Sequence, residues 1–293
     1  MLVDLLKRTG HDLAFTILEI GAVPLAKGPK EPFHALLDAF PRSRILAFEV
    51  DRALCAQLNA RAPRGLTYHP VALGKTEEER DFYETQHPMC SSLYRPNEAL
   101  MDLFQALRVA KLKKVSRLRT VSLDHFMKRA SVGEVDFIKI DIQGAELEVF
   151  QGGTAALEGV VAIITEVEFV PLYVDQPLFG DVSAFLTGRG LAFHKFLGVA
   201  GRALKPIFLN NDPNYAVQHM WSDAMFIRDL LAVDGLDNAR TLKLAVLAEL
   251  YGSPDVAHHL LAAFDRRNGG ELSKQYLQLL KGGGPAAGAV TPP

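Results

Sequence analysis

The stretch from Val135 to Phe150, VDFIKIDIQGAELEVF, constrains the fold of this chain more than any other. It begins with an apolar run interrupted only by Lys139 and Asp141, which predicts a buried strand with polar groups near its carboxyl end. Gly144 then predicts a turn into a helix. Ligands of open α/β sheets bind outside the carboxyl ends of strands, so Asp141 is expected at such a site. In the alternative interpretation, Asp141 only caps the helix that follows.

Strand and helix signals alternate along most of the chain, as in α/β folds with a parallel sheet. Strands are predicted at residues 15–20, 44–49, 66–73, 81–83, 119–123, 137–142, 159–168, 191–196 and 224–228. Helices are predicted between them at residues 1–13, 31–40, 53–61, 97–111, 124–130 and 181–189. We expect a Rossmann-like α/β fold with one sheet of seven mostly parallel strands and helices on both faces.

The composition changes after residue 234. Amphipathic patterns predict helices at 239–251, 254–266 and 271–281, the first two forming a hairpin. We therefore divide the chain into a main domain (1–234), a C-terminal helical appendage (235–281) and a disordered tail (282–293). The apolar faces of the hairpin exceed what it can bury internally, so we expect it to pack on the main domain, on a second copy of the chain or on another protein.

Composition excludes several classes of protein. Hydrophobic residues make up 48% of the 293 residues and the net charge is −2, which is typical of a soluble globular protein and gives no electrostatic argument for nucleic acid or a membrane. Two cysteines, Cys55 and Cys90, form neither a disulfide framework nor a metal cluster. The apolar run within residues 1–8 is too short for a signal peptide, so none is expected, and no uncharged apolar run reaches membrane-spanning length. We expect a cytoplasmic protein without nucleic-acid or membrane partners.

A nucleotide-type site is predicted where the first two strands end. Gly21 and Ala22 follow the first strand, and Glu49 ends the second. A carboxylate at this position suits a ribose, because it can accept hydrogen bonds from two hydroxyl groups. The full G-x-G-x-x-G pattern is absent. These features favour an adenosine cofactor without distinguishing a dinucleotide from another adenosine compound.

Several segments together resemble the FkbM-type S-adenosylmethionine-dependent methyltransferases, which have the class I methyltransferase fold. The segments are Glu19–Ala22, Ala47–Glu49, Val71–Gly74, Ser91–Leu93, Thr120–Asp124 and Phe137–Glu146. The resemblance is most specific around Asp141. It implies a methyltransferase domain within residues 1–234, S-adenosyl-L-methionine as cofactor, and O-methylation of a hydroxyl group on a small-molecule or glycan acceptor, such as a sugar or a secondary metabolite.

The resemblance also implies roles for residues near the strand ends. Glu19 and Asp141 would face the sulfonium and ammonium groups of the cofactor, and Glu49 would hold its ribose. The expected cofactor-binding residues are Glu19, Gly21, Ala22, Glu49, Val50, Ala72, Leu73, Ser92 and Asp141. Catalytic roles are expected for Asp141, Glu166 and Glu168, the last two on one face of a strand. The candidates for a general base are Glu166, Glu168, His87 and His194.

Two departures from the family pattern bear on the site. The family usually has Asn and Gly where this chain has Val23 and Leu25, a change that could reshape the pocket for the amino-acid end of the cofactor. It usually has Glu where this chain has Gln143, so a charge beside Asp141 is lost and no metal is expected.

Two other hypotheses remain open. One is a nicotinamide-dependent oxidoreductase, which is disfavoured by the absent G-x-G-x-x-G pattern. The other is a non-catalytic adaptor with a degenerate methyltransferase domain, which the altered first loop supports.

Overall fold

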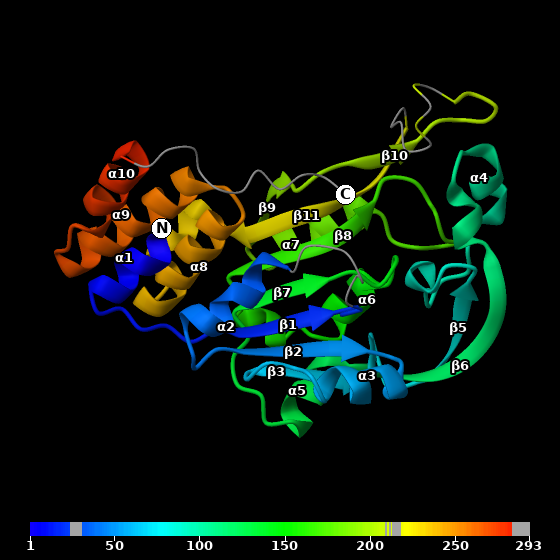
Figure 1. Cartoon of the computed structure of the whole chain (residues 1–293), viewed down its shortest axis with the longest axis horizontal. Coiled ribbons are helices and arrows are strands. Elements are labelled where there is room, and N and C mark those ends of the chain that lie inside the picture. Colours follow the sequence, from blue (N-terminus) through cyan, green and yellow to red (C-terminus); the bar gives the residue numbers. More distant parts are fainter. Residues whose placement is uncertain (24–30, 209, 211, 213–217, 283–293) are drawn as a thin grey trace.

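In a computed structural model that describes residues 1–23, 31–208, 210, 212 and 218–282, the chain is built around an eight-stranded sheet (Figure 1). The strand order is β10-β11-β8-β7-β1-β2-β3, and β9 also pairs with β11. These strands are β1 (Thr16–Ile20), β2 (Arg44–Glu49), β3 (Leu66–Pro70), β7 (Phe137–Ile140), β8 (Ala162–Glu168), β9 (Leu191–Phe196), β10 (Ala200–Arg202) and β11 (Gln218–Arg228).

The central strands are buried on both faces. Five neighbouring strands of this sheet run parallel, in the order β3, β2, β1, β7 and β8. Strand β11 lies antiparallel to β8. Neighbouring residues of β1 enter different cores. Ile17 packs in the core that contains α1 (Leu2–Arg8) and α8 (Asn238–Leu250), whereas Leu18 packs in the core that contains α5 (Leu123–Arg129), α6 (Glu146–Gln151) and α7 (Phe179–Thr187). Because successive side chains alternate between two dry faces, such strands have nearly continuous apolar sequences.

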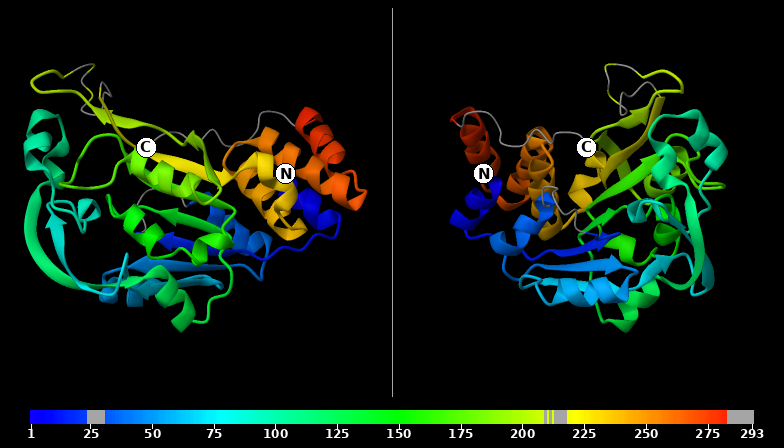
Figure 2. Two further views of the ribbon diagram at one scale, coloured as in Figure 1. Left: turned by 180° about the vertical axis from the view of Figure 1, so that it is seen from behind. Right: turned by 45° about the vertical axis from the view of Figure 1, so that its right-hand side comes forward.

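Helices cover both faces of the sheet, as the two views of Figure 2 also show. The helices before residue 190 are α1 (Leu2–Arg8), α2 (Ala35–Ala39), α3 (Arg52–Asn59), α4 (Glu98–Leu103), α5 (Leu123–Arg129), α6 (Glu146–Gln151) and α7 (Phe179–Thr187). The C-terminal helices are α8 (Asn238–Leu250), α9 (Pro254–Asn268) and α10 (Leu272–Gly282). Short 3-10 turns are η1 (Pro32–His34), η2 (Pro88–Cys90), η3 (Leu107–Ala110), η4 (Ala156–Glu158) and η5 (Leu230–Gly235).

A second sheet, which we call the arm, lies beyond the carboxyl ends of the parallel strands. It has the order β4-β6-β5 and consists of β4 (Ala72–Gly74), β5 (Glu79–Thr85) and β6 (Leu112–Ser122). In Figures 1 and 2, β6 bends around this side of the molecule and leads back from α4 to the main sheet. The arm thus encloses the edge of the main sheet at which ligands of α/β folds bind.

The predicted α/β architecture is confirmed, with a mostly parallel sheet, helices on both faces and C-terminal helices. The expectation of one seven-stranded sheet is wrong in detail, because the main sheet has eight strands and the arm forms another. The strand predicted at 66–73 divides after Pro70, which lacks an N–H group to continue the pairing. The helix predicted at 97–111 divides at Ala106, whose φ of 57° is left-handed.

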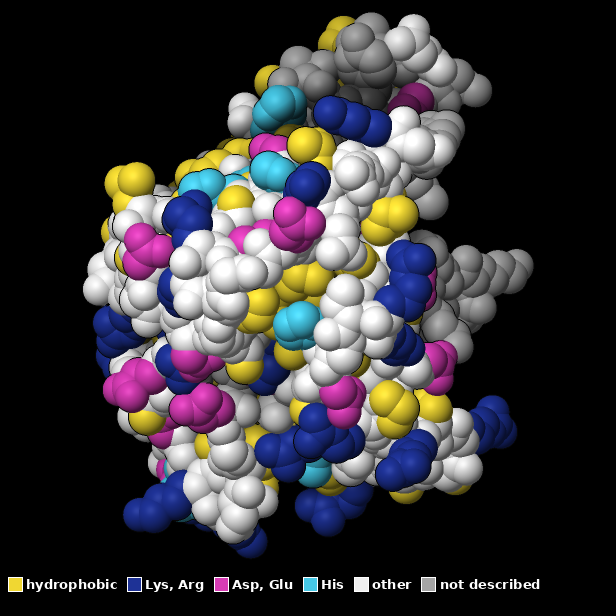
Figure 3. All heavy atoms as spheres, turned by 90° about the vertical axis from the view of Figure 1, so that its left-hand side faces the viewer, with side chains coloured by type: hydrophobic (Ala, Val, Ile, Leu, Met, Phe, Trp, Pro, Cys, Tyr) yellow, Lys and Arg dark blue, Asp and Glu magenta, His cyan; other side chains and the backbone are white. Residues whose placement is uncertain are grey.

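The C-terminal helices share their core with the main sheet. Side chains of α8 and α9 belong to the same cluster as Phe137 of β7, and the rings of Tyr251 and Phe137 are 5.9 Å apart. The outer surface of this end carries interspersed acidic and basic side chains (Figure 3). Packing on the main domain is therefore observed, whereas the division at residue 234 stays a prediction; residues 283–293 of the predicted tail lie outside the described part.

Across the described ranges, none of the helices combines the length and apolar character needed to cross a lipid bilayer.

This packing predicts a stability effect at Leu247, which is fully buried between α8 and its neighbours. Leu247→Ala should lower the free energy of unfolding by about 2–5 kcal/mol, because it leaves a cavity in the shared core. Urea unfolding monitored by circular dichroism measures this effect. Leu231→Ala is the matched control, since Leu231 is 96% exposed and its truncation should change little. Equal stability of the two variants would contradict the shared core.

Candidate active site

The turn after β1 and the end of β7 approach each other at backbone distance. Gly21 has a φ of 83°, and a Cβ atom built on it would lie 1.9 Å from the carbonyl oxygen of Asp141. The Asp141 N–H also donates to the carbonyl oxygen of Ile20, at 2.9 Å. Only glycine fits such a position, since any side chain would collide with the neighbouring backbone. The glycine turn and Asp141 are therefore held side by side.

Gln143 connects the polar side chains that follow β7. Its Nε2 atom donates to Asp141 Oδ1 at 2.8 Å and to Glu166 Oε2 at 2.6 Å. Its Oε1 atom lies 3.0 Å from the hydroxyl of Tyr173, and its backbone carbonyl accepts a hydrogen bond from Ser92 Oγ at 2.7 Å. The residue has a left-handed φ of 61° and precedes Gly144, so a tight turn directs its side chain between the two carboxylates.

Three buried carboxyl groups near this amide have pKa values above the ordinary one. Burial raises the pKa of Glu146 to about 7, and the nearby charge of Asp141 acts in the same direction. Burial and the charges of Asp141 and Glu168 raise the pKa of Glu166 well above its ordinary value. Burial also raises the pKa of Glu168, with contributions from Glu146 and Asp141. A carboxylate with a raised pKa is a stronger base than an ordinary one, which is the property required of a general base.

Oxygen atoms of Asp141, Glu146 and Glu166 lie within 4.8 Å of one another, close enough to surround a divalent cation. Two of these three carboxylates are already bridged by the amide nitrogen of Gln143. A neutral hydrogen-bond donor thus occupies the position between Asp141 and Glu166. Hydrogen bonds from Gln143 therefore explain why the carboxylates of Asp141 and Glu166 can lie so close together, and no metal ion is required to explain it.

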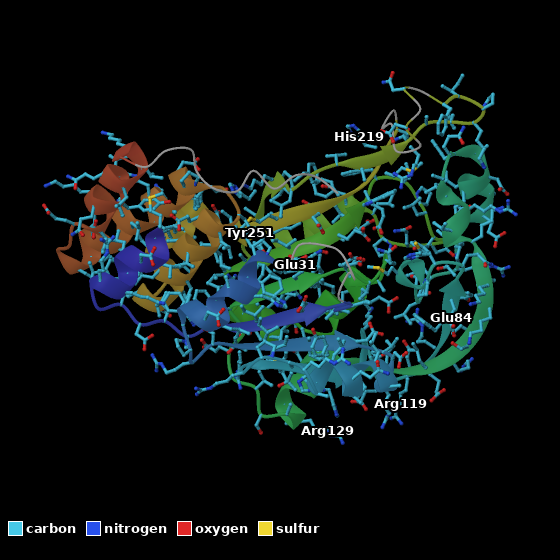
Figure 4. All side chains as sticks on the ribbon, in the orientation of Figure 1. Glu31, Glu84, Arg119, Arg129, His219 and Tyr251 are labelled. Atoms are coloured by element: carbon cyan, nitrogen blue, oxygen red, sulfur yellow. The ribbon has the colours of Figure 1, made fainter. Side chains whose placement is uncertain are left out.

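A cavity of about 780 Å³ lies between these carboxyl groups and the arm. Its polar wall includes Asp141, Gln143, Glu166 and Glu168. The opposite wall is largely apolar and consists of side chains from the arm, α4, η3, the segment after β8, and β11: Phe82, Met101, Leu107, Val109, Leu118, Leu172 and Trp221. Glu84 of β5, labelled in Figure 4, also lines it. The cavity therefore offers a reactive polar side and a broad apolar surface.

The structure brings most of the predicted site residues to this cavity. Those that line it are Gly21, Glu49, Val50, Ala72, Leu73, Asp141, Glu166, Glu168 and the candidate base His87. Glu49 is oriented by the N–H of Asp51, which donates to its Oε1 atom at 2.9 Å. Ala22 is buried in the core, and Ser92 donates a hydrogen bond to the backbone of Gln143, while its neighbour Ser91 lines the cavity.

Two of the predicted residues lie elsewhere. His194 is bound to Ser253 at the start of α9, with 2.8 Å between Nε2 and Oγ. Glu19 does not line the cavity; its Oε2 atom lies 2.9 Å from Nε2 of His34. Because side chains alternate along a strand, Glu19 and the cavity-lining residue Ile20 face opposite sides of β1. Of the altered first loop, Val23 lines the cavity, whereas Leu25 lies outside the described residues.

Glu19 belongs instead to a polar cluster on the side of the sheet that faces the C-terminal helices. Lys139 Nζ donates to Asp223 Oδ1 at 2.7 Å in this cluster, and Glu31 and Tyr251 lie near each other there (Figure 4). Burial opposes the charge of Lys139, but the carboxylates of Asp223 and Asp141 hold its pKa above the ordinary value. Lys139 therefore stays protonated and neutralises carboxylates, so it cannot accept a proton from a substrate.

Comparison with known proteins identifies the family. Residues 29–193, more than half of the chain, match the Methyltransferase FkbM domain. The chain belongs to the FkbM methyltransferase family. The match contains the whole segment from Asp141 to Glu168, while Gly21 precedes it and the C-terminal helices follow it.

Solved structures similar to this FkbM chain include an FkbM methyltransferase from Methylobacillus flagellatus KT, with 13% identity and a TM-score of 0.39. That similarity covers 77% of this chain and 47% of the other, so the chain spans about half the length of that protein. Another is magnesium protoporphyrin IX methyltransferase from Synechocystis PCC 6803 with bound SAM, at 8% identity and a TM-score of 0.36, covering 78% of this chain and 76% of that one. No curated protein matches the chain.

Sequence reasoning missed several residues of the FkbM site. Gln143 was considered only as a lost charge, although its amide joins Asp141 to Glu166. Tyr173 was not considered, because it follows a strand without any local motif. The apolar wall was missed because its residues come from six separate segments. The alternation in β6, where Ser116 and Leu118 line the cavity and Arg117 and Arg119 are exposed, was a usable signal.

The raised pKa of Glu146 predicts a pH effect on stability. Because burial raises the pKa of Glu146 to about 7, the folded protein keeps a proton on this carboxyl up to about that pH, whereas the unfolded chain releases it near the ordinary pKa of 4.5. The free energy of unfolding should therefore fall as the pH rises through this range and level off above it. Glu146→Gln keeps an oxygen for the N–H of Ile142 and should reduce this decline, which urea unfolding at several pH values measures.

The exposed Glu79→Gln is the control for this measurement and should decline like the wild type. Glu166 and Glu168 have pKa values shifted in the same direction, so part of the decline should remain in Glu146→Gln. An unchanged or steeper decline in Glu146→Gln would show that Glu146 is ionised in the folded protein at neutral pH.

Proposed function

We propose that this FkbM domain transfers a methyl group from S-adenosyl-L-methionine to a hydroxyl oxygen of an acceptor with a substantial apolar part. The observation that carries the proposal is the cavity at the carboxyl ends of the parallel strands. It places Glu49 and the end of β2 on one side and the cluster of Asp141, Gln143 and Glu166 on another. Family membership supports methyl transfer; the roles of individual residues rest on the geometry of the cavity.

The residues near Glu49 fit the adenosine part of the cofactor. Glu49 is held by Asp51 N–H through one oxygen and retains acceptor capacity for ribose hydroxyl groups. Val50, Ala72 and Leu73 lie beside it in the cavity wall and offer apolar surfaces to an adenine ring. The backbone turn at Gly21 leaves no side chain between the cofactor and Asp141. Glu19, which is bonded to His34, is not part of this proposed binding surface.

The carboxyl groups fit the acceptor side. When bound, S-adenosyl-L-methionine supplies an electrophilic methyl group on a cationic sulfur. The ionised form of Glu166, a stronger base because burial raises its pKa, would take the proton of the acceptor hydroxyl. The acceptor oxygen would then bond to the methyl carbon as the bond from that carbon to sulfur breaks, which leaves S-adenosyl-L-homocysteine. Asp141 would place negative charge beside the reacting atoms. Gln143 keeps the carboxylates of Asp141 and Glu166 in fixed orientations through its two hydrogen bonds. Positioning of the reacting atoms and exclusion of water account for most of the rate enhancement expected here.

The apolar wall narrows the acceptor class. Sugars and glycans present hydroxyl groups on most of their surface and would leave these groups unpaired against apolar side chains. The wall formed by Phe82, Met101, Leu107 and Trp221 instead matches an apolar molecular body. Among the acceptor classes considered from sequence, a secondary metabolite with a hydroxyl group on an apolar skeleton fits best.

The role of Asp141 can be tested by Asp141→Asn, which keeps the oxygen that accepts from Gln143 but removes the charge. We expect kcat to fall on the order of 10²-fold, because the side chain at position 141 would keep its shape but would no longer position the reactants through its charge. Transfer of a tritiated methyl group to apolar hydroxy compounds measures the effect. The conservative control is Asp124→Asn, a residue at the start of α5 that is not part of the cavity wall.

Full activity of Asp141→Asn would assign Asp141 a purely structural role and leave the chemistry to Glu166 or Glu168. Methyl transfer to sugars but not to apolar hydroxy compounds would contradict the proposed acceptor class.

A further inference from the structure

Five large apolar side chains are exposed on segments at the end of the molecule opposite α8–α10, the end at which Figure 1 shows α4 and β10. Their exposed fractions lie between 49% and 54%, and a group of neighbouring exposed apolar side chains is typical of an interaction site. They belong to the end of α4, to η3 and to the segment after β10: Leu103, Val109, Leu204, Ile207 and Phe208. We call these five residues the apolar patch.

Hydrogen bonds hold two of these three segments, the end of α4 and the segment after β10, next to each other. Lys205 N–H donates to the carbonyl oxygen of Leu103 at 2.8 Å, and Gln105 N–H donates to that of Ala203 at 2.9 Å. The Gln105 side chain also donates to the carbonyl oxygen of Ile207, at 3.0 Å. Residues 204–208 thus form a defined surface segment in which every residue is exposed.

Basic side chains lie directly beside the apolar patch. Arg108, Lys111 and Lys205 surround Asp102, whose pKa they lower, the hydrogen bond from Lys111 contributing most. Lys111 Nζ lies 2.5 Å from Asp102 Oδ1, and Lys205 Nζ donates to the carbonyl oxygen of Asp102 at 3.0 Å. Three cations therefore face one carboxylate, which leaves an excess of positive charge next to the exposed apolar residues.

We propose that this surface, the apolar patch with Arg108, Lys111 and Lys205, docks the protein on an anionic lipid bilayer. Apolar side chains flanked by Lys and Arg suit the boundary between acyl chains and negatively charged headgroups, since each part of the surface meets its complement there. The net charge of −2 averages over the whole chain and does not describe this face. Docking here is peripheral and needs no membrane-spanning segment.

The docking surface adjoins the cavity. Leu107, Val109 and Ala110 of η3 line the cavity, and Val109 also belongs to the apolar patch. An acceptor with an apolar body could therefore pass from a bilayer into the cavity without crossing water; this consequence rests on the proposed function, whereas the docking itself does not.

Vesicle flotation with the full chain tests the proposal. The protein should bind vesicles of phosphatidylcholine mixed with phosphatidylglycerol, and binding should weaken in 1 M salt, where the Debye length falls to about 3 Å. The double variant Ile207→Asp, Phe208→Asp should lose binding, because it brings charge into the inserted part. Arg108→Gln and Lys205→Gln should each weaken binding about fivefold, as expected for one cation near an anionic surface.

Leu231→Asp is the control for an added carboxylate, since it places one negative charge on a 96% exposed leucine away from the docking surface. It should bind as the wild type does. Three results would overturn the proposal: no binding of the wild type to anionic vesicles, equal binding to pure phosphatidylcholine, or unchanged binding of the Ile207→Asp, Phe208→Asp variant. A dimer of the wild type that this double variant abolishes, without vesicle binding by either, would assign the surface to a second copy of the chain instead. Methyl transfer to a soluble acceptor by the double variant would show that the cavity works independently of docking.

Discussion

The contact between the turn at Gly21 and the backbone of Asp141 is the constraint on which the rest of the site depends. A Cβ atom at position 21 would lie 1.9 Å from the Asp141 carbonyl oxygen, so the two strand ends can meet only because residue 21 is glycine. Their meeting places the turn of a nucleotide-type site against the strand end that carries Asp141. From there, the tight turn at Gln143 and Gly144 directs an amide between Asp141 and Glu166. The close approach of these two backbone segments thus determines where the glycine turn, Asp141 and Gln143 lie relative to one another.

The arm lies across the cavity from the carboxyl groups at this strand end. Burial raises the pKa of Glu146, Glu166 and Glu168, because it disfavours their charged forms. Phe82 and Leu118 of the arm form part of the apolar wall opposite Glu166 and Glu168. The proposed base and the proposed binding surface for an apolar acceptor therefore face each other across one cavity, and Val109 of the cavity wall also belongs to the proposed docking surface.

The sequence was sufficient for those parts of the molecule that depend on local pattern. Apolar runs buried on both faces predicted the central strands, and the polar ends of these runs predicted Glu49, Asp141, Glu166 and Glu168, all of which line the cavity. It was insufficient where the fold joins distant segments. Glu19 was expected at the cofactor, but alternation along β1 turns it towards His34. The arm was underestimated because basic residues interrupt the apolar pattern of β6, which is solvated on one face. The bridging role of Gln143 depends on a left-handed turn that residue types do not reveal.

The central claim is that the cavity binds S-adenosyl-L-methionine with Glu49 at its ribose, and calorimetric titration of the wild-type chain and Glu49→Ala tests it most directly. The account predicts one site for S-adenosyl-L-methionine, no binding of NAD, and an affinity that Glu49→Ala weakens by about 1.5–3 kcal/mol, the range for hydrogen bonds to a charged group. Exposed Glu79→Ala should leave the affinity unchanged. Binding of NAD in place of S-adenosyl-L-methionine, binding of neither, or an unchanged affinity in folded Glu49→Ala would contradict the account.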